Sequence, residues 1–559
     1  MKKAIAAGVI VVVVLASLWC FGRPAYGRYQ EKRYAQQARE CMAKRDYRHA
    51  ALSAQQALRH NPRNVDACRV NAELADLSRS PNALDWRRRV AEAEPTIQNK
   101  LLLATTALRA QGPPYPLATQ TLEELTDSAK GVATYHAVWA ELALKLKNSG
   151  EAAARFEQAS RLEPTNGLYQ LNLAVLRLQS TNAATAAAAR ATLERLRRDP
   201  RLGAVALRWL VAECLRQKDP AGAQGFSTQL LADAHCVPED RLQHLTILQQ
   251  AHSAEFTQYL ETVRRLAVTN ALEVYGLSSW MLSHGLVDEA LGWLTNCPAK
   301  VRSEQPVPLA LVDCYLVKKN WEALETFLQQ EKWADRECLR WAFLSRTAAE
   351  LNQNQAAEVR WRTAVREAGG RLGPLTALLG LATSWGRNTD KEDLLWQIAQ
   401  RFPKERWAIR ELDRLYLAAG NTRGLNKLYA MMASYDARNF VAQNNLAATS
   451  LLLNLNLPKT HELAKEVFTQ HPGEAVIAST YAYSLHLQGR TRDGLAVLEK
   501  LKADALETPP VALYYGILLS AAGDTNKAGK YLSIAQKSDL LPEEKALATE
   551  ATKRLPSAN

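Results

Sequence analysis

The stretch DYRHAALSAQQALRHNPRN, residues 46–64, determines how the rest of the chain is read. Alanines fall at 50, 54 and 57, and Asn61-Pro62 ends the segment. Because residues three and four apart share one face of a helix, the stretch predicts a helix with a small-residue face. A proline just past such a pattern is a helix stop signal. The segment is therefore either a single helix or one copy of a repeated unit.

Prolines that end predicted helices recur at related distances. Pro62 and Pro164 are 102 residues apart, and Pro62 and Pro472 are 410 apart. These separations are close to multiples of 34, and a period of about 34 residues is typical of helix–turn–helix repeats. The spacing favours the repeated unit.

Three distant segments resemble the tetratricopeptide repeat in their interior pattern. Positions in that family are counted through the whole repeat unit. Position 8 lies in the first helix and positions 20 and 27 lie in the second; all three carry small residues, and large apolar residues surround them. The units starting at Glu31, Ala271 and Pro509 match at positions 8 and 20, with Ala38 and Ala50, Ser278 and Ala290, and Gly516 and Ala528. Small side chains at these positions allow helices to approach closely.

The resemblance, to membrane-anchored bacterial tetratricopeptide-repeat proteins, implies an all-α fold. We expect a right-handed superhelical solenoid of about fifteen helix pairs, preceded by one transmembrane helix. The predicted organisation is an anchor at 1–22, a repeat array at 28–540, and a capping helix and tail at 541–559. No Gly/Ser-rich or Pro-rich linker divides the array.

An apolar run precedes the repeats. Residues 4–21, AIAAGVIVVVVLASLWCF, contain no charge and follow Lys2 and Lys3. At about 1.5 Å per residue, a helix of this length just spans the roughly 30 Å hydrocarbon core of a bilayer. The residues at the C-terminal end of this run lack the small-residue pattern of a signal-peptide cleavage site. An uncleaved inner-membrane anchor is therefore expected, and a cleaved signal peptide is the alternative. We expect a periplasmic soluble part, with a cytoplasmic location as the alternative.

The chain carries a net charge of +13, and the excess is uneven. The segment 23–89, beside the apolar run, holds 15 basic and 7 acidic residues. A basic segment at this place suits an anionic lipid surface, and an Arg-rich solvated face explains it equally well. Nucleic acid is not an expected partner, because no reader motif or set of stacking aromatic residues accompanies the charge.

The sequence shows no motif that carries catalysis, so no enzyme activity, cofactor or metal is expected. The eight cysteines include no CxxC pair and are predicted to be buried thiols, with scattered disulfides as the alternative. His244 and His252 share a helical face, but surface histidines explain them better than a metal site does.

The predicted function lies in a surface. In the family, positions 2, 5, 9 and 12 of each first helix point into a concave groove, and Arg, Tyr and Trp are enriched in binding surfaces. Carried onto the C-terminal units, the resemblance implies a partner-binding groove formed by Trp407, Arg410, Arg414, Asn444, Ser479, Tyr483 and His486.

The sequence thus predicts a membrane-tethered scaffold that binds a protein or peptide, in cell-envelope assembly or secretion. A solvated groove without a partner explains the same residues equally well. An enzyme with unrecognised chemistry in residues 239–400 and a purely structural spacer are the alternative functions.

Overall fold

The computed structural model describes residues 23–555, and every regular element in this range is a helix. The prediction of an all-α fold is confirmed for this part of the chain. The apolar run at 4–21 lies outside the described residues. Of the helices between residues 23 and 555, none is both long enough and apolar enough to cross a bilayer.

Thirty of the helices in residues 23–555 form fifteen successive pairs, as the period predicts. The first helix of each pair is called A and the second B. The pairs are α2 (Arg23–Ala43) and α3 (Tyr47–His60), α4 (Val65–Leu77) and α5 (Ala83–Ala93), α6 (Ile97–Ala110) and α7 (Pro116–Glu124), α8 (Ala133–Lys145) and α9 (Ser149–Leu162), α10 (Gly167–Arg177) and α11 (Ala183–Leu196), α12 (Gly203–Arg216) and α13 (Pro220–Leu231), α14 (Pro238–Gln250) and α15 (Phe256–Ala267), α16 (Ala271–Ser283) and α17 (Val287–Thr295), α19 (Val307–Lys318) and α20 (Trp321–Gln330), α21 (Glu337–Glu350) and α22 (Asn354–Glu367), α23 (Leu372–Ser384) and α24 (Asn388–Arg401), α25 (Arg406–Ala418) and α26 (Thr422–Tyr435), α27 (Phe440–Leu452) and α28 (Leu457–Gln470), α29 (Ala475–Leu487) and α30 (Thr491–Leu498), and α32 (Pro509–Ala522) and α33 (Thr525–Ala535).

Four further elements lie outside the pairs. They are the short helices α18 (Ala299–Ser303) and α31 (Ala503–Leu506), the 3-10 turn η2 (Ala334–Arg336), and the C-terminal helix α34 (Pro542–Lys553). The last of these lies inside the segment 541–559 that the sequence assigns to a capping helix and tail.

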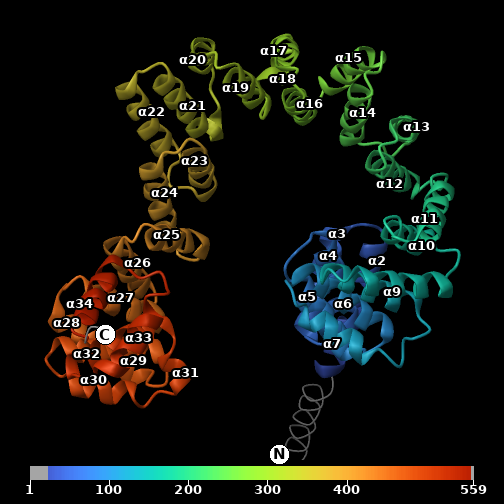
Figure 1. Cartoon of the computed structure of the whole chain (residues 1–559). Coiled ribbons are helices and arrows are strands. Elements are labelled where there is room, and N and C mark those ends of the chain that lie inside the picture. Colours follow the sequence, from blue (N-terminus) through green and yellow to red (C-terminus); the bar gives the residue numbers. More distant parts are fainter. Residues whose placement is uncertain (1–22, 556–559) are drawn as a thin grey trace, which may run out of the picture. The chain divides into compact units, whose positions relative to one another are not determined.

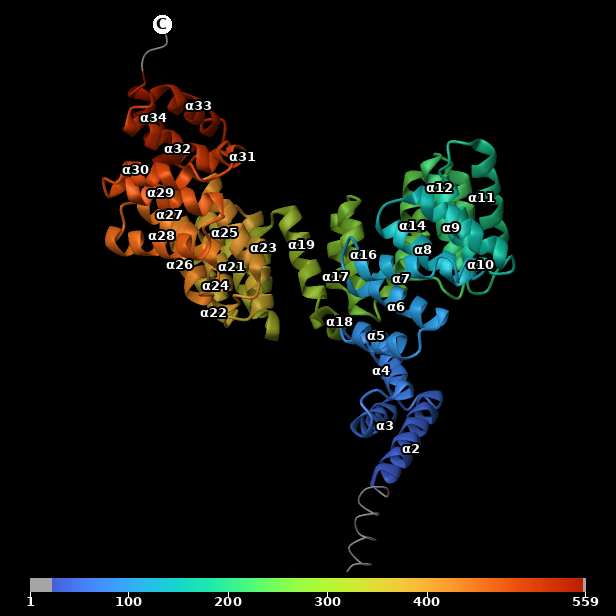
Figure 2. The ribbon, with the colours of Figure 1, turned by 90° about the horizontal axis from the view of Figure 1, so that it is seen from below.

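The described part of the chain divides into two compact units: unit 1 extends to residue 280, and unit 2 begins at residue 281. Within each unit, successive helices lie side by side as pairs (Figure 1 and Figure 2). Neighbouring A helices also pack on one another, as α6 does on α8 in unit 1, and α27 on α29 in unit 2. Each unit therefore has one face built mainly from A helices.

Close packing explains the small residues of the repeat pattern. Ala38, Ala50 and Ala528 are fully buried. A Cβ atom added to Gly516 would lie 2.9 Å from Cγ of Leu532, which is closer than a real side chain allows. The predicted small positions are therefore the places where A and B helices approach most closely.

The turn from A to B follows one geometry in thirteen of the fifteen pairs of residues 23–555. At each of these thirteen turns, one of the first two residues after the A helix adopts a left-handed conformation. The amide of the following residue donates to the carbonyl five residues back, as Asn148 does to Ala143 at 2.8 Å. This is the Schellman ending of a helix. The left-handed residues are Arg45, Arg79, Lys147, Lys218, His252, Gly285, Lys319, Asn352, Gly386, Gly420, Asn454, Gly489 and Gly523.

At six of these turns the next residue also begins helix B. Its side-chain oxygen accepts a hydrogen bond from the amide three residues later, which satisfies a donor that the helix leaves free. These N-cap residues are Asp46, Asn148, Asp219, Asn320, Asn421 and Asp524, with bonds of 2.9–3.3 Å.

Seven cysteines lie in the described residues, and none forms a disulfide there. Five of them are buried, namely Cys68, Cys214, Cys297, Cys314 and Cys338, while Cys41 and Cys236 are half-buried. Burial raises the pKa of these five thiols, and that of Cys314 to about 12. The interpretation of the cysteines as thiols that fill small apolar positions is confirmed for these five.

Replacing Gly494 in α30 by Ala should destabilise unit 2. Alanine favours a helix interior over glycine by about 1 kcal/mol, but the new Cβ would lie 2.7 Å from the carbonyl oxygen of Ala482. We expect a net loss of about 1–3 kcal/mol. Hydrogen exchange of the amides of α29 and α30 measures this loss.

The matched control is Gly292→Ala in α17, where no atom lies within 4 Å of the added Cβ. This change should stabilise its own helix by up to about 1 kcal/mol. A Gly494→Ala protein whose α29 and α30 exchange no faster than in the wild type would contradict the close packing inferred at this position.

Candidate functional site

An exposed tryptophan marks the A-helix face of unit 1. Trp209 on α12 is 38% exposed, and Val205 on the same helix and Val237 before α14 are exposed beside it. Together with residues of α14 they line a hollow of about 500 Å³. We call this surface the Trp209 groove, and its lining residues are Val205, Arg208, Trp209, Ala212, Val237, Glu239, Asp240 and Gln243.

An ion pair holds the two sides of the Trp209 groove together. Arg208 of α12 donates from Nε and Nη2 to the two carboxylate oxygens of Asp240, at 2.8 Å each, and from Nη2 to the carbonyl of His235. Asp240 is buried and also accepts from the amide of Val237, at 2.9 Å, so it fixes the start of α14. The hydrogen bonds to Asp240 raise the pKa of Arg208. The two-point geometry orients α12 against α14 and thereby sets the shape of the groove.

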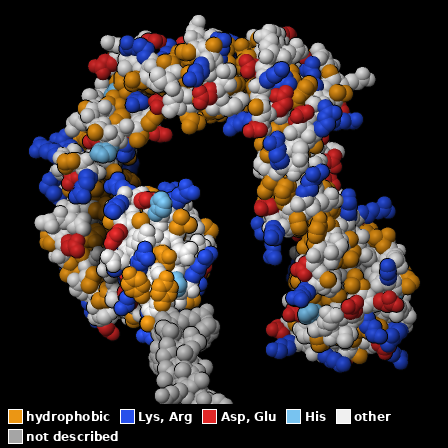
Figure 3. Space-filling view, turned by 180° about the vertical axis from the view of Figure 1, so that it is seen from behind, with side chains coloured by type: hydrophobic (Ala, Val, Ile, Leu, Met, Phe, Trp, Pro, Cys, Tyr) orange, Lys and Arg blue, Asp and Glu red, His pale blue; other side chains and the backbone are white. Residues whose placement is uncertain are grey.

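A second hollow extends this surface along α14. It has a volume of about 260 Å³, shares Glu239 with the Trp209 groove, and is lined by Leu242 and Leu272. Arg241 and Glu273 form an ion pair of 3.2 Å beside these leucines. Leu272 is 70% exposed, so apolar side chains continue from α12 to α16 between charged pairs. In the space-filling view, apolar, basic and acidic side chains are likewise interspersed (Figure 3).

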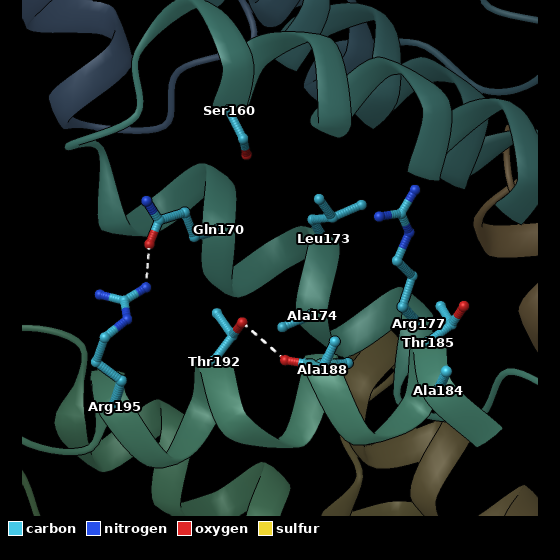
Figure 4. Close-up of a pocket in the computed structure, with 11 residues that line it drawn as sticks. Ser160, Gln170, Leu173, Ala174, Arg177, Ala184, Thr185, Ala188, Thr192 and Arg195 are labelled. Atoms are coloured by element: carbon cyan, nitrogen blue, oxygen red, sulfur yellow. Dashed lines mark hydrogen bonds between the residues drawn. The ribbon is translucent and has the colours of Figure 1, made fainter. Parts of the chain in front are cut away.

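A further hollow, of about 430 Å³, lies among α9, α10 and α11 (Figure 4). Small side chains of α11, including Ala188 and Thr192, form one wall. Its arginines are already engaged, because Arg195 donates to Gln170 and Arg177 pairs with Glu157 at 2.7 Å. Because both arginines of this hollow already have partners, it is a weaker candidate for a binding site than the Trp209 groove.

The predicted groove residues of unit 2 fall into two sets. On α25, Arg410 and Arg414 are exposed and Trp407 is half-buried, with its indole N–H donating to Glu405 at 3.1 Å. Arg414 pairs with Glu411 at 2.7 Å. These three side chains can meet a partner in the structure as it stands.

The other four predicted residues lie on α27 and α29 and are less accessible. Asn444, Ser479 and Tyr483 are buried, and His486 is half-buried and bonded to Thr491 Oγ1 at 3.0 Å. Burial raises the pKa of Tyr483 to about 12 and lowers that of His486. Tyr483, which the resemblance assigns to the groove, is a packing residue in the structure, because its ring centre lies 4.8 Å from that of Tyr514. Ala548 and Ala551 of α34 belong to the same apolar cluster.

The Trp209 groove was not predicted, although the turn offers a signal for it. If the left-handed Lys218 is aligned with Gly285 of the unit from Ala271, Val205 falls at position 2 and Arg208 at position 5. Trp209 then follows directly at position 6, one residue away from the positions that the family pattern assigns to the groove. A large apolar side chain in a helix is usually a packing residue, and Trp209 is an exception because it is exposed.

The predicted lipid-binding segment 23–89 is partly neutralised by internal pairs. Arg87 is buried and pairs with Asp76 at 2.6 Å, while Arg39 and Arg69 both pair with Asp66. Binding of anionic lipid by the remaining cations stays a prediction. Among residues 23–555, no group of three or more His, Cys, Asp and Glu side chains is gathered as a metal site would require.

The helix pairs, their period, the small contact positions and the repeated turn together define a tetratricopeptide-like helical-repeat fold. No protein-family model matches the chain, and no curated protein is similar to it in sequence.

Several solved structures are similar to the chain. Naa15/Naa10 bound to HypK-THB is 16% identical, with 94% of this chain and 79% of that chain covered and a TM-score of 0.26. The APC/C hetero-tetramer Cut9–Hcn1 is 12% identical, with 86% and 96% covered and a TM-score of 0.29. A tetratricopeptide-repeat protein from Parabacteroides merdae is 14% identical, with 51% and 98% covered and a TM-score of 0.24. At such TM-scores the fold assignment depends on the chain's own geometry, and no function is taken from these proteins.

Tyr483 and Arg410 should respond differently to truncation, although the sequence pattern assigns both to one groove. Tyr483→Ala removes a buried ring and should destabilise unit 2 by about 3–5 kcal/mol. Arg410→Ala removes an exposed side chain and should change stability by less than about 0.5 kcal/mol. Chemical denaturation of the two variants measures the difference, and equal stability would show that Tyr483 is not a packing residue.

Proposed function

We propose that the chain is a membrane-tethered scaffold that binds a protein partner on the A-helix face of unit 1, in cell-envelope assembly or secretion. The repeat array would follow a right-handed superhelical course. The observation that carries the binding proposal is the Trp209 groove, in which an exposed tryptophan and two exposed valines line one hollow. Large aromatic side chains contribute most of the energy at many protein interfaces, so an exposed tryptophan in a preformed hollow is a strong anchor.

The surroundings of Trp209 favour a protein over a small molecule as the partner. The hollow is open and continues past Glu239 toward Leu272, so it suits an extended or helical segment. Exposed apolar side chains alternate with the pairs Arg208–Asp240 and Arg241–Glu273. An apolar centre with a polar rim is typical of protein interfaces.

Tethering is supported by the apolar run at 4–21, which is long enough to span a bilayer. The basic segment 23–89 follows it directly and would lie near anionic headgroups. The envelope or secretion role rests on this combination of an anchor with a repeat array.

A photo-crosslinking side chain placed at Val205 should join the full-length protein to one discrete partner in native membranes. Trp209→Ala should weaken that binding by about 2 kcal/mol or more, since an anchoring aromatic is lost. This is a roughly 30-fold loss of affinity. The yield of the adduct, measured by mass spectrometry, reports the effect.

The matched control places the same crosslinker at Leu266, which is 49% exposed on the B helix α15 of unit 1. It should give no such adduct. Equal adducts at the two positions, or an adduct at Val205 that Trp209→Ala leaves unchanged, would remove the Trp209 groove as the binding surface.

The intact protein should stay with membranes after a high-salt wash and enter solution only with detergent, because an apolar span holds it rather than charge. A chain that starts at residue 23 should appear in the supernatant. Fractionation with immunodetection checks this. Release of the intact protein by salt alone would contradict the anchor.

A further inference from the structure

The C-terminal helix α34 follows the last helix pair and packs mainly on an A helix. Many A helices pack closely on the B helix before them, as α29 does on α28, whereas α23 packs more on the A helix α21 than on the B helix α22. In the same way, α34 packs chiefly on the A helix α32 and only marginally on the B helix α33. It lies on the A-helix face of the last repeats, where the family pattern places a ligand.

The start of α34 reaches a distant repeat. Thr422 at the beginning of α26 donates a hydrogen bond to the carboxylate of Glu543, across 121 residues of sequence. Pro542 lies so close to the turn at Gly420 that an added Cβ there would be 3.2 Å from its ring. Leu541 packs on the apolar cluster that includes residues of α21 to α26. The helix therefore spans several repeats, as a bound ligand does, rather than capping only the last one.

Two polar side chains of the A helix α32 bind the two ends of α34. Tyr514 of α32 donates to Glu544 in the first turn, at 3.1 Å. Ser520, also of α32, donates to the carbonyl of Ala551 near the last turn, at 2.9 Å. Helix ends carry backbone groups that the helix itself leaves without partners, so contacts of this kind recognise a helix at a defined position.

The centre of α34 presents a small apolar face. Ala548 and Ala551 are 1% and 5% exposed and cluster with Tyr483 and Tyr514. Because their side chains are small, the helix backbone approaches the tyrosines closely. Ala546, in contrast, is exposed on the opposite side of α34.

We propose that α34 is a displaceable internal ligand of a C-terminal groove formed by Gly420, Thr422, Tyr483, Tyr514 and Ser520, and that the groove's external partner is a helix of the same chemistry. Such a helix has two small residues three apart on its buried face and a pair of glutamates in its first turn. It competes with α34, so the groove is closed until the partner displaces the internal helix. The predicted contact of Tyr483 with a partner then requires that α34 has left, because Tyr483 clusters with Ala548 and Ala551.

This groove is separate from the Trp209 groove, and the proposal depends on the scaffold function only for the identity of the external helix. The occupied state can be tested by itself. The probe is a fluorescent peptide with the sequence of residues 539–555, added to the full-length protein. In the wild type the internal α34 competes, because it is present at a high effective concentration.

Ala548→Arg in the full-length chain should release α34, because a charged side chain cannot be buried against the tyrosines. The wild-type peptide should then bind at least tenfold more tightly than it binds the wild-type chain. Ala546→Arg is the matched control, since it adds the same charge to the exposed side of α34, and it should behave as the wild type. A peptide that itself carries the Ala548→Arg change should not bind either variant.

Failure of the peptide to bind an Ala548→Arg chain that keeps its helical content and its exchange protection in α29 and α32 would overturn the proposal. Hydrogen exchange of the wild type gives a second test that needs no variant. The amides of α34 should exchange together and faster than those of α32. Exchange of both helices in a single step would overturn the proposal. The result at Trp209 affects neither measurement, so the two proposals can fail separately.

Discussion

The turn that closes each A helix is the constraint on which the rest of the structure depends. A left-handed residue followed by an amide that donates five residues back reverses the chain within a few residues, and this occurs at thirteen turns in residues 23–555. Because the reversal is so short, helix B must lie against helix A. The small residues at the contact positions then decide how closely the two helices approach.

The same turn explains why the middle of the chain folds regularly despite a degenerate apolar pattern. The segment with α14 and α15 departs from the repeat consensus, yet His252 takes the left-handed conformation and Ser253 donates to Leu248 at 2.9 Å. Only one residue in this turn needs an unusual conformation, and Lys, Arg, His and Asn supply it at other turns as well as Gly. A search for glycine alone therefore overlooks eight of these thirteen turns.

The sequence was sufficient to predict the helix pairs but not to predict which side chains are exposed for binding. The period and the small residues such as Ala50 and Gly516 depend on contacts between neighbours along the chain, which a local pattern records. Tyr483, in contrast, is buried in a cluster that joins Tyr514 of α32 with Ala548 and Ala551 of α34. The contact of Thr422 with Glu543 likewise joins residues that no repeat period relates. The Trp209 groove was missed for a different reason. Trp209 is large and apolar, so a pattern of side-chain types assigns it to packing, whereas its environment leaves it 38% exposed.

The buried thiols give the chain an internal set of chemical reporters. Cys68, Cys214, Cys314 and Cys338 lie on different A helices, and their burial keeps them protonated and out of contact with reagents in solution. Each becomes reactive only when its own helix pair opens. The rate at which a maleimide labels each cysteine therefore measures the opening of that helix pair. Labelling of the unmodified protein thus reports the local stability at four places along the array.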